Sequence, residues 1–363
     1  MGQALSDALG DSPPPHDTLD PGPLSDAELA EALKRFAEHA TDGALAQGAF
    51  DALAEDKHDD FAAAARHASF YDAARRGAPT VDVQAFVAFC GVATRGSRSR
   101  RLEHVVTAGL GVRTLSDACD AAQTKRLAAL MFSLVGAEPS PAVERALVNC
   151  EDAGACARWL DRNAPGLADA YAAWARRRFL NDARPAPTIP AASGLLAPAS
   201  IRACLLLSDV RTYGGLLRPL YASSKDGWSF QRLCREILGW AGPTLLVARA
   251  GARVFGVLAD EAWRDDRTPF GASGCRLYTF APAFAVARPR AGQSQDLLYL
   301  NTKGSASVTK GLVVGGGAVH IPTELGDARI KVGRSLAFES LALVDDATVR
   351  RDGGWVDVDE LEV

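Results

Sequence analysis

The chain has 363 residues, of which 48% are hydrophobic, and a formal net charge of −4. This length predicts two or three domains with packed cores, and the negative charge argues against nucleic-acid binding, which usually needs a basic face. Seven scattered cysteines without a Cys-x-x-Cys pair favour reduced thiols in the cytosol over a disulfide framework. No secretory signal is recognisable, and arginines interrupt the two most apolar stretches, at Arg202 and at Arg249 and Arg253, so we expect no membrane span.

Residues 1–24 are expected to form a disordered tail. They begin Met-Gly-Gln-Ala-Leu-Ser, which fits the pattern for N-terminal myristoylation of Gly2, with Ser6 at the preferred position. The alternative is an ordinary N-terminus that happens to begin with this pattern. One acyl chain gives only marginal membrane binding, and no Lys or Arg precedes Lys34 to supply a basic second signal. Durable membrane residence would therefore need a protein partner.

Residues 25–91 are predicted to form a degenerate EF-hand-like helical pair. Ser25 and Glu28 form a capping box at the start of the first helix. Gly43 and Leu45 stand at loop positions six and eight of an EF-hand, whereas Ala49 replaces the bidentate Glu that calcium requires. A fainter second copy places Val81 at the matching strand position, and its ligand positions are also non-acidic, so no calcium is expected. Two unrelated helical hairpins are the alternative.

Residues 92–180 are predicted to be helical, because apolar residues recur at helical spacing and are interrupted by prolines and asparagine. The sequence does not indicate what this region does. Residues 181–194 contain three prolines and are expected to be a linker.

Residues 195–363 contain the most specific pattern. A turn at Lys225–Gly227 precedes a short amphipathic helix, which Gly242-Pro243 ends. Two β-rich runs, 244–249 and 253–261, flank Gly251 and predict a hairpin. Further strands are expected at 274–280, at 298–301 and from 311, and an acidic strand at 359–363. The large aromatic residues Phe230, Trp240, Phe255, Trp263 and Tyr278 are interpreted as core.

In this order of elements, residues 195–363 resemble the TLDc domain. The resemblance implies a β-sandwich with small helices and no established catalytic site. The fold class is therefore α+β multidomain, with an all-α, degenerate EF-hand-like N-terminal region followed by the TLDc β-sandwich. The long helical N-terminal region and the myristoylation pattern resemble the subgroup of TLDc proteins found at lysosomal and vacuolar membranes and associated with mTOR.

That resemblance implies a partner and a place. TLDc proteins are associated with the vacuolar proton-pumping ATPase and with resistance to oxidative stress. The expected function is a non-catalytic adaptor, cytoplasmic and peripheral on a lysosomal or vacuolar membrane, that binds peripheral subunits of this ATPase. As partner-binding residues we consider Glu261 beside Trp263, and the acidic closing strand with Asp359, Glu360 and Glu362.

Catalysis is not favoured by the sequence. His320 is the one histidine in 195–363, and Cys204, Cys234 and Cys275 lie in apolar periodic segments where buried thiols are the norm. No metal-ligand spacing, phosphate loop or cofactor motif is present in the sequence, so we predict no enzyme, cofactor or metal. The alternative function is protection against oxidants through Cys275 or Cys234.

Overall fold

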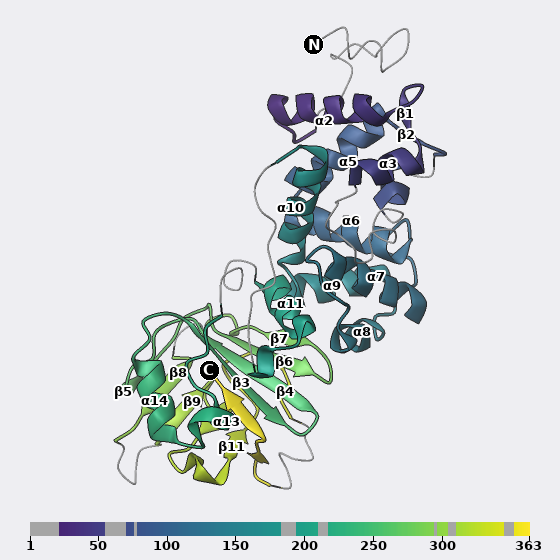
Figure 1. Ribbon diagram of the computed structural model, residues 1–363. Helices are drawn as coiled ribbons and strands as arrows, with labels where there is room; N and C mark the ends of the chain where they lie inside the picture. Colours follow the sequence, from purple (N-terminus) through teal and green to yellow (C-terminus); the bar gives the residue numbers. More distant parts are fainter. Residues whose placement is uncertain are drawn as a thin grey trace. The chain divides into compact units, whose positions relative to one another are not determined.

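The computed structural model describes residues 22–54, 70–75, 78–182, 194–209, 217–293, 296–303, 310–344 and 352–363. The chain forms two compact units (Figure 1). Met1–Pro190 with Arg202–Gly215 makes one, here called the helical unit. Ala191–Ile201 with Leu216–Val363 makes the other, the sheet unit. The predicted α+β arrangement is confirmed, and the chain passes between the units more than once.

The helical unit begins with helix α2 (Asp26–His39), whose start is fixed by the predicted capping box. The backbone N–H of Glu28 donates to the Ser25 hydroxyl at 3.4 Å, and the N–H of Ser25 donates to the Glu28 carboxylate at 3.0 Å. These two bonds satisfy donors that a helix N-terminus otherwise leaves unpaired.

Two short strands join the predicted EF-hand-like halves. Strand β1 (Ala44–Leu45) lies between α2 and α3 (Gln47–Ala54), and strand β2 (Val81–Asp82) leads into α5 (Val83–Arg95). The strands are antiparallel, and Leu45 is the Cα partner of Val81, as the sequence pattern predicts. Gly43, with a φ of 72°, makes the sharp turn into β1.

Further helices among the described residues of this unit are α6 (Arg98–Leu110), α7 (Ala121–Ser133), α8 (Pro141–Leu147), α9 (Ala153–Asn163), α10 (Leu167–Phe179) and most of α11 (Ala199–Ser208), and residues 70–75 are helical as well. Aromatic side chains fill the core around α10. The rings of Tyr171 and Trp174 stack on Phe70 at 4.9 and 4.8 Å between centroids. The hydroxyl of the buried Tyr171 side chain lies 2.9 Å from His104 Nδ1, so this buried polar group has a hydrogen-bond partner.

The sheet unit contains two antiparallel sheets. One has the order β12 (Trp355–Asp357), β11 (Arg329–Val332), β10 (Val319–Ile321), β9 (Gly311–Val314), β8 (Leu298–Asn301), β5 (Asp266–Phe270). The other has the order β13 (Glu360–Glu362), β3 (Thr244–Ala250), β4 (Arg253–Ala259), β6 (Arg276–Ala281), β7 (Ala285–Ala287). Inward side chains of both sheets share one buried cluster, which is the arrangement of a β-sandwich.

The predicted hairpin is β3–β4. Its register runs from Thr244 opposite Ala259 to Ala250 opposite Arg253, and Gly251 in the loop has the positive φ of 58° that the turn requires. Helix α14 (Phe230–Leu238) packs its apolar face into the same core. The described residues of the unit also include the short segments η2 (Gly194–Leu196), η3 (Leu325–Asp327) and α13 (Ser223–Asp226).

Candidate partner-binding surface

Trp263 is a core residue of the sandwich. Its side chain is 5% exposed, its indole N–H donates to the Thr244 hydroxyl at 2.8 Å, and its ring meets Phe270 edge-on at 5.9 Å. The indole therefore fastens the loop after β4 to the first residue of β3. It presents little surface to a partner.

Glu261, two residues earlier in the same loop, does reach the surface. Its carboxylate lies 3.8 Å from the guanidinium of Arg264; the Arg264 side chain is exposed and that of Glu261 partly exposed. The Arg264 guanidinium in turn lies 4.6 Å from the centre of the Phe270 ring, a cation–π contact. The buried Trp263 thus anchors a loop whose charged residues face solvent.

The acidic closing strand is confirmed as β13, but its carboxylates are bonded within the sheet unit. Glu360 pairs with the Arg249 guanidinium at 3.1 Å. Asp359 is exposed and accepts the backbone N–H of Gly251 at 2.7 Å. These two contacts tie β13 to the β3–β4 hairpin.

Glu362 has a structural role at the other end of β13. Its carboxylate accepts the backbone N–H of Leu195 at 2.7 Å and therefore holds segment η2 against the strand. Burial raises the pKa of this carboxyl above its ordinary value of 4.5, with a smaller contribution from the charge of Glu360. A Cβ on Gly194 would collide with this carboxylate, so the position suits glycine.

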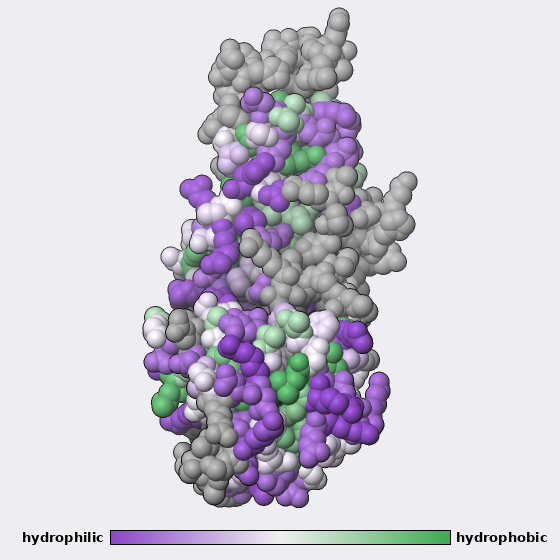
Figure 2. All heavy atoms as spheres, turned by 90° about the vertical axis from the view of Figure 1, so that its left-hand side faces the viewer, coloured by the Kyte–Doolittle hydropathy of each residue, from purple (hydrophilic) through white to green (hydrophobic). Residues whose placement is uncertain are grey.

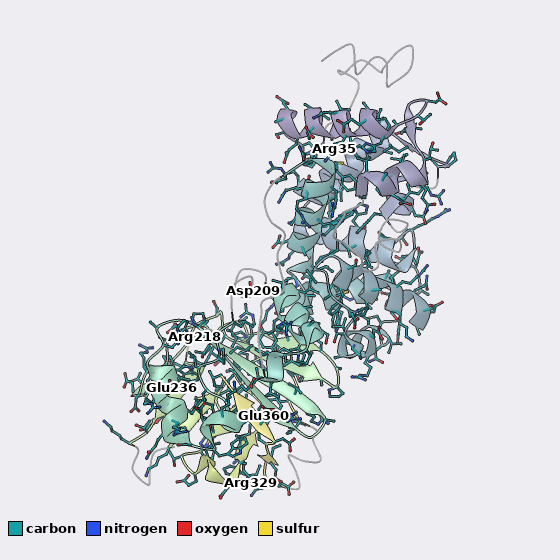
Figure 3. All side chains as sticks on the ribbon, in the orientation of Figure 1. Arg35, Asp209, Arg218, Glu236, Arg329 and Glu360 are labelled. Carbon is teal, nitrogen blue, oxygen red and sulfur yellow. The ribbon has the colours of Figure 1, made fainter. Side chains whose placement is uncertain are left out.

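The structure does not bring the predicted binding residues together. Glu261 follows Ala259, which pairs with Thr244 at the start of β3, whereas Glu360 pairs with Arg249 near its end. Five residues of strand separate these two positions, about 17 Å at the usual rise per residue. Figure 3 labels Glu360, on β13.

A surface that the sequence interpretation missed lies at the start of β3. Trp240 was expected in the core, but its side chain is 38% exposed, as is that of Leu238. Helix α14 ends at Leu238, so the chain turns away before the helical spacing can bury Trp240. The Trp240 indole donates to the carbonyl of Pro243 at 3.0 Å, which fixes the ring in place.

Trp240 and Glu261 therefore flank the same end of the β3–β4 hairpin, because Pro243 directly precedes Thr244 and Glu261 follows its partner strand. We call Leu238, Trp240, Glu261 and Arg264 the β3-start surface. Figure 2 looks onto the side of the sheet unit that carries α14 and shows a small hydrophobic area within a largely hydrophilic surface.

The thiols of the sheet unit are poorly suited to nucleophilic chemistry. Burial raises the pKa of Cys234 and that of Cys275 to about 12. Cys275 also donates its S–H to the Asp260 carboxylate at 2.8 Å, which favours the neutral thiol further. His320 lies on β10 of the opposite sheet, where its Nε2 is 3.0 Å from the carbonyl of Lys310. This contact is to the backbone and not to Cys234 or Cys275.

Comparison with known proteins identifies the domain. Residues 199–350 match the family described as the TLDc domain. These residues form a TLDc domain. The chain is 33% identical over 101 residues to Oxidation resistance protein 1 of Xenopus tropicalis and 32% identical over 101 residues to Oxidation resistance protein 1 of Xenopus laevis. Each match covers 28% of this chain and 12% of the frog protein, so only a small part of the relatives is shared.

The β3-start surface lies inside the matched TLDc range, whereas β13 with Asp359, Glu360 and Glu362 follows it. The match begins on helix α11, and from Arg202 onward this helix belongs to the helical unit. The buried thiol of Cys204 on α11, whose pKa burial raises to about 12, is hydrogen-bonded to Ser140 of the helical unit.

Other predicted features are placed as follows. Gly2 and most of the proline-rich linker lie outside the described residues. Where the chain is described, no three His, Cys, Asp or Glu side chains are grouped to hold a metal ion. Among the same residues, no helix is both long and apolar enough to cross a bilayer.

Proposed function

We propose that the chain is a non-catalytic adaptor that binds the vacuolar proton-pumping ATPase through its TLDc domain. The partner follows from the resemblance to TLDc proteins, and the TLDc match supports it. The observation that carries a binding role is the β3-start surface, where Trp240 and Leu238 remain solvent-accessible beside a charged loop.

The composition of this surface suits protein recognition. Tryptophan and arginine are enriched among residues that dominate binding energies, especially where an apolar centre is bordered by charge. The bond between the Trp240 indole and Pro243 holds the ring before any partner arrives, so little side-chain entropy remains to be lost on docking.

The adaptor is proposed to act at the cytosolic face of a lysosome- or vacuole-type membrane. A myristoyl group on Gly2 would supply a weak, reversible contact, and the ATPase would supply the durable one. The subgroup resemblance also motivates a link to mTOR signalling. Myristate labelling of wild type and of Gly2→Ala tests the first step, because only the wild type should incorporate the lipid.

Affinity purification of the full chain from cells tests the partner. We expect Trp240→Ala and Glu261→Lys each to reduce recovery of peripheral ATPase subunits roughly tenfold or more, as for central interface residues. Leu336→Ala is the matched control, since Leu336 is 81% exposed and lies outside the β3-start surface. Equal recovery from all four proteins would overturn the role of this surface. Absence of ATPase subunits from the wild-type sample would overturn the partner.

Protection against oxidants is a second candidate, and the similarity to Oxidation resistance protein 1 favours it. The buried thiols of Cys234 and Cys275 do not favour direct peroxide chemistry in the TLDc domain. Peroxide consumption by the full chain, lost specifically in Cys275→Ser or Cys234→Ser, would support the thiol-based form of this function. Unchanged consumption in both variants would reject that form.

A further inference from the structure

Two cysteine side chains meet in the helical unit, although 37 positions separate them in the chain. Cys119 lies just before α7, and Cys156 lies in the first turn of α9. Their sulfur atoms are 4.0 Å apart. The Cys119 thiol also donates to the backbone carbonyl of Cys150 at 3.4 Å, which helps to fix its position. The fold therefore places two oxidisable groups in contact.

Main-chain hydrogen bonds clamp together the two segments that carry these cysteines. The N–H of Cys119 donates to the carbonyl of Glu151 at 3.3 Å. The N–H of Ala153 donates to the carbonyl of Asp117 at 3.0 Å. Because these bonds do not involve sulfur, they hold the segments side by side whether the thiols are reduced or oxidised.

The start of α9 is fixed by further contacts to the same segment. Ala118 and Asp152 form an antiparallel bridge, and Asp152 caps the helix by accepting the N–H of Ala155 at 2.6 Å. The N–H of Gly154 donates to the carbonyl of Leu115 at 2.8 Å, and a Cβ on Gly154 would lie only 3.1 Å from that oxygen. Glycine thus permits the close approach of the two segments.

The two sulfur atoms are close to the geometry of a disulfide. A disulfide needs sulfur atoms about 2.05 Å apart. From 4.0 Å, the remaining approach is about 2 Å, which rotation of two cysteine side chains about χ1 can supply. Because the backbone is already clamped, closing the bond locks an existing corner and leaves the helices where they are.

The two thiols differ in their access to solvent. Cys119 is partly exposed, whereas Cys156 is buried. A small oxidant from solvent therefore reaches the Cys119 sulfur first. Burial raises the pKa of the Cys119 thiol, so little thiolate is present near neutral pH and the first step is slow. Proximity, and not an unusually acidic thiol, is what favours this pair.

We propose that Cys119 and Cys156 form a reversible disulfide when low-molecular-weight disulfides, such as glutathione disulfide, accumulate. The Cys119 thiolate attacks one sulfur of the small disulfide, the S–S bond breaks, and one small thiolate leaves and takes up a proton. Cys119 is then part of a mixed disulfide. The Cys156 sulfur attacks the Cys119 sulfur, the mixed S–S bond breaks, and the second small thiol leaves with the Cys156 proton. One small disulfide is reduced to two thiols, and two protein thiols are oxidised to one disulfide.

The pair lies in the helical unit, outside the residues that match the TLDc domain, and does not depend on ATPase binding. Its disulfide would close a loop that contains α7 and α8. Such a crosslink limits the freedom of the unfolded chain, so the oxidised protein should unfold at a higher temperature than the reduced one.

The test equilibrates the reduced full chain in buffers with graded ratios of glutathione to glutathione disulfide. Free thiols are then alkylated, and the protein is digested with trypsin and a Glu-specific protease for mass spectrometry. Trypsin releases Cys119 on residues 114–125, and cleavage after Glu151 separates Cys150, on 146–151, from Cys156, on 152–158. We expect residues 114–125 to be linked to residues 152–158 until a dithiol reductant is added.

The same titration in concentrated urea tests whether the fold is responsible. Without the backbone clamp, the two thiols meet only by random closure of the chain. We expect the equilibrium constant for the link between 114–125 and 152–158 to be on the order of a hundredfold larger in the folded protein. The buried Cys90 and Cys204 are internal references in the folded sample, where both should remain free for alkylation after denaturation.

Variants assign the two roles. In Cys156→Ala, the mixed disulfide with glutathione should accumulate on Cys119, because the second thiol is missing. In Cys119→Ala, Cys156 should stay reduced. Cys150→Ala is the matched control and should retain the link, since Cys119 contacts the backbone carbonyl of Cys150, which this substitution keeps. Circular dichroism of each reduced variant checks that it is folded.

Three outcomes would overturn the proposal. The first is complete alkylation of Cys119 and Cys156 in buffers in which glutathione disulfide predominates. The second is a disulfide that joins the Cys150 peptide to either of the other two in place of the expected link. The third is an equal equilibrium constant in folded and urea-unfolded protein, which would show that the contact between the thiols has no effect.

Discussion

The carboxylate of Glu362 accepts the backbone N–H of Leu195 at 2.7 Å. The two residues are 167 positions apart in the chain, so this bond joins the first segment of the sheet unit to its last strand. The same strand pairs with β3 along one edge, and along the other edge the Ser223 hydroxyl accepts the N–H of Leu361 at 2.9 Å.

Loss of this carboxylate should loosen the start of the sheet unit. In Glu362→Ala, the Leu195 N–H loses its acceptor, which costs about 1–3 kcal/mol when a charged partner is removed. Hydrogen exchange followed by mass spectrometry should show faster exchange at residues 194–197. Asp359→Ala is the matched control, and its effect should be confined to the Gly251 turn. Unchanged exchange at 194–197 would contradict a structural role for Glu362.

The same residue predicts a dependence of stability on pH. Because burial raises the pKa of Glu362 above 4.5, the folded protein binds this proton more tightly than the unfolded chain. The contribution of Glu362 to the free energy of unfolding therefore falls as pH rises from 4.5 and becomes constant above the folded pKa. Glutamine at position 362 does not titrate, so Glu362→Gln lacks this pH-dependent contribution. The stability of Glu362→Gln relative to wild type should therefore increase between pH 4.5 and the folded pKa of Glu362. The increase should be less than about 1 kcal/mol, because solvent screens the partly exposed carboxyl. If the difference in the free energy of unfolding between wild type and Glu362→Gln stays constant over this pH range, the raised pKa of Glu362 is rejected.

The two tryptophans near the start of β3 should respond very differently to truncation. Trp263→Ala removes a buried ring and its bond to Thr244, and should cost about 3–5 kcal/mol of unfolding free energy. Trp240→Ala removes a partly exposed ring and should cost about 1 kcal/mol or less. Urea denaturation of the two variants measures the difference. Similar losses would mean that Trp240 is part of the core.

The short ladder of the helical unit should also carry stability. Leu45 is fully buried and pairs with Val81, so Leu45→Ala should cost about 2–5 kcal/mol. Its neighbour Ala44 is half-buried, and Ala44→Ser should change stability by less than about 0.5 kcal/mol. Thermal unfolding compares them. A small effect of Leu45→Ala would show that the ladder does not hold the EF-hand-like halves together.

Local patterns predicted much of the fold. The capping box at Ser25 and the Gly251 hairpin depend on neighbours in sequence, and both are confirmed. Such features are readable because turn chemistry and side-chain period act over a few residues.

Features that depend on distant residues were less predictable. Trp240 was interpreted as a core residue with the other large aromatics, but helix α14 ends two residues before it and the ring stays partly exposed. The acidic residues of β13 remain predicted binding residues, and their bonds to Arg249, Gly251 and Leu195 could not be read from the sequence because these partners lie far along the chain. The sequence reading also missed that the sulfur atoms of Cys119 and Cys156 lie 4.0 Å apart, because the two residues are 37 positions apart in the chain.

The division of α11 bears on how this protein should be cut for experiments. A fragment that starts at Ala199, where the family match starts, would lack Leu195 and leave Glu362 without its amide donor. It would also expose the buried apolar side chains of α11, because from Arg202 onward this helix belongs to the helical unit, which the fragment lacks. Such a truncated product should be prone to self-association, so point substitutions in the intact polypeptide are the sounder way to assign roles to either half.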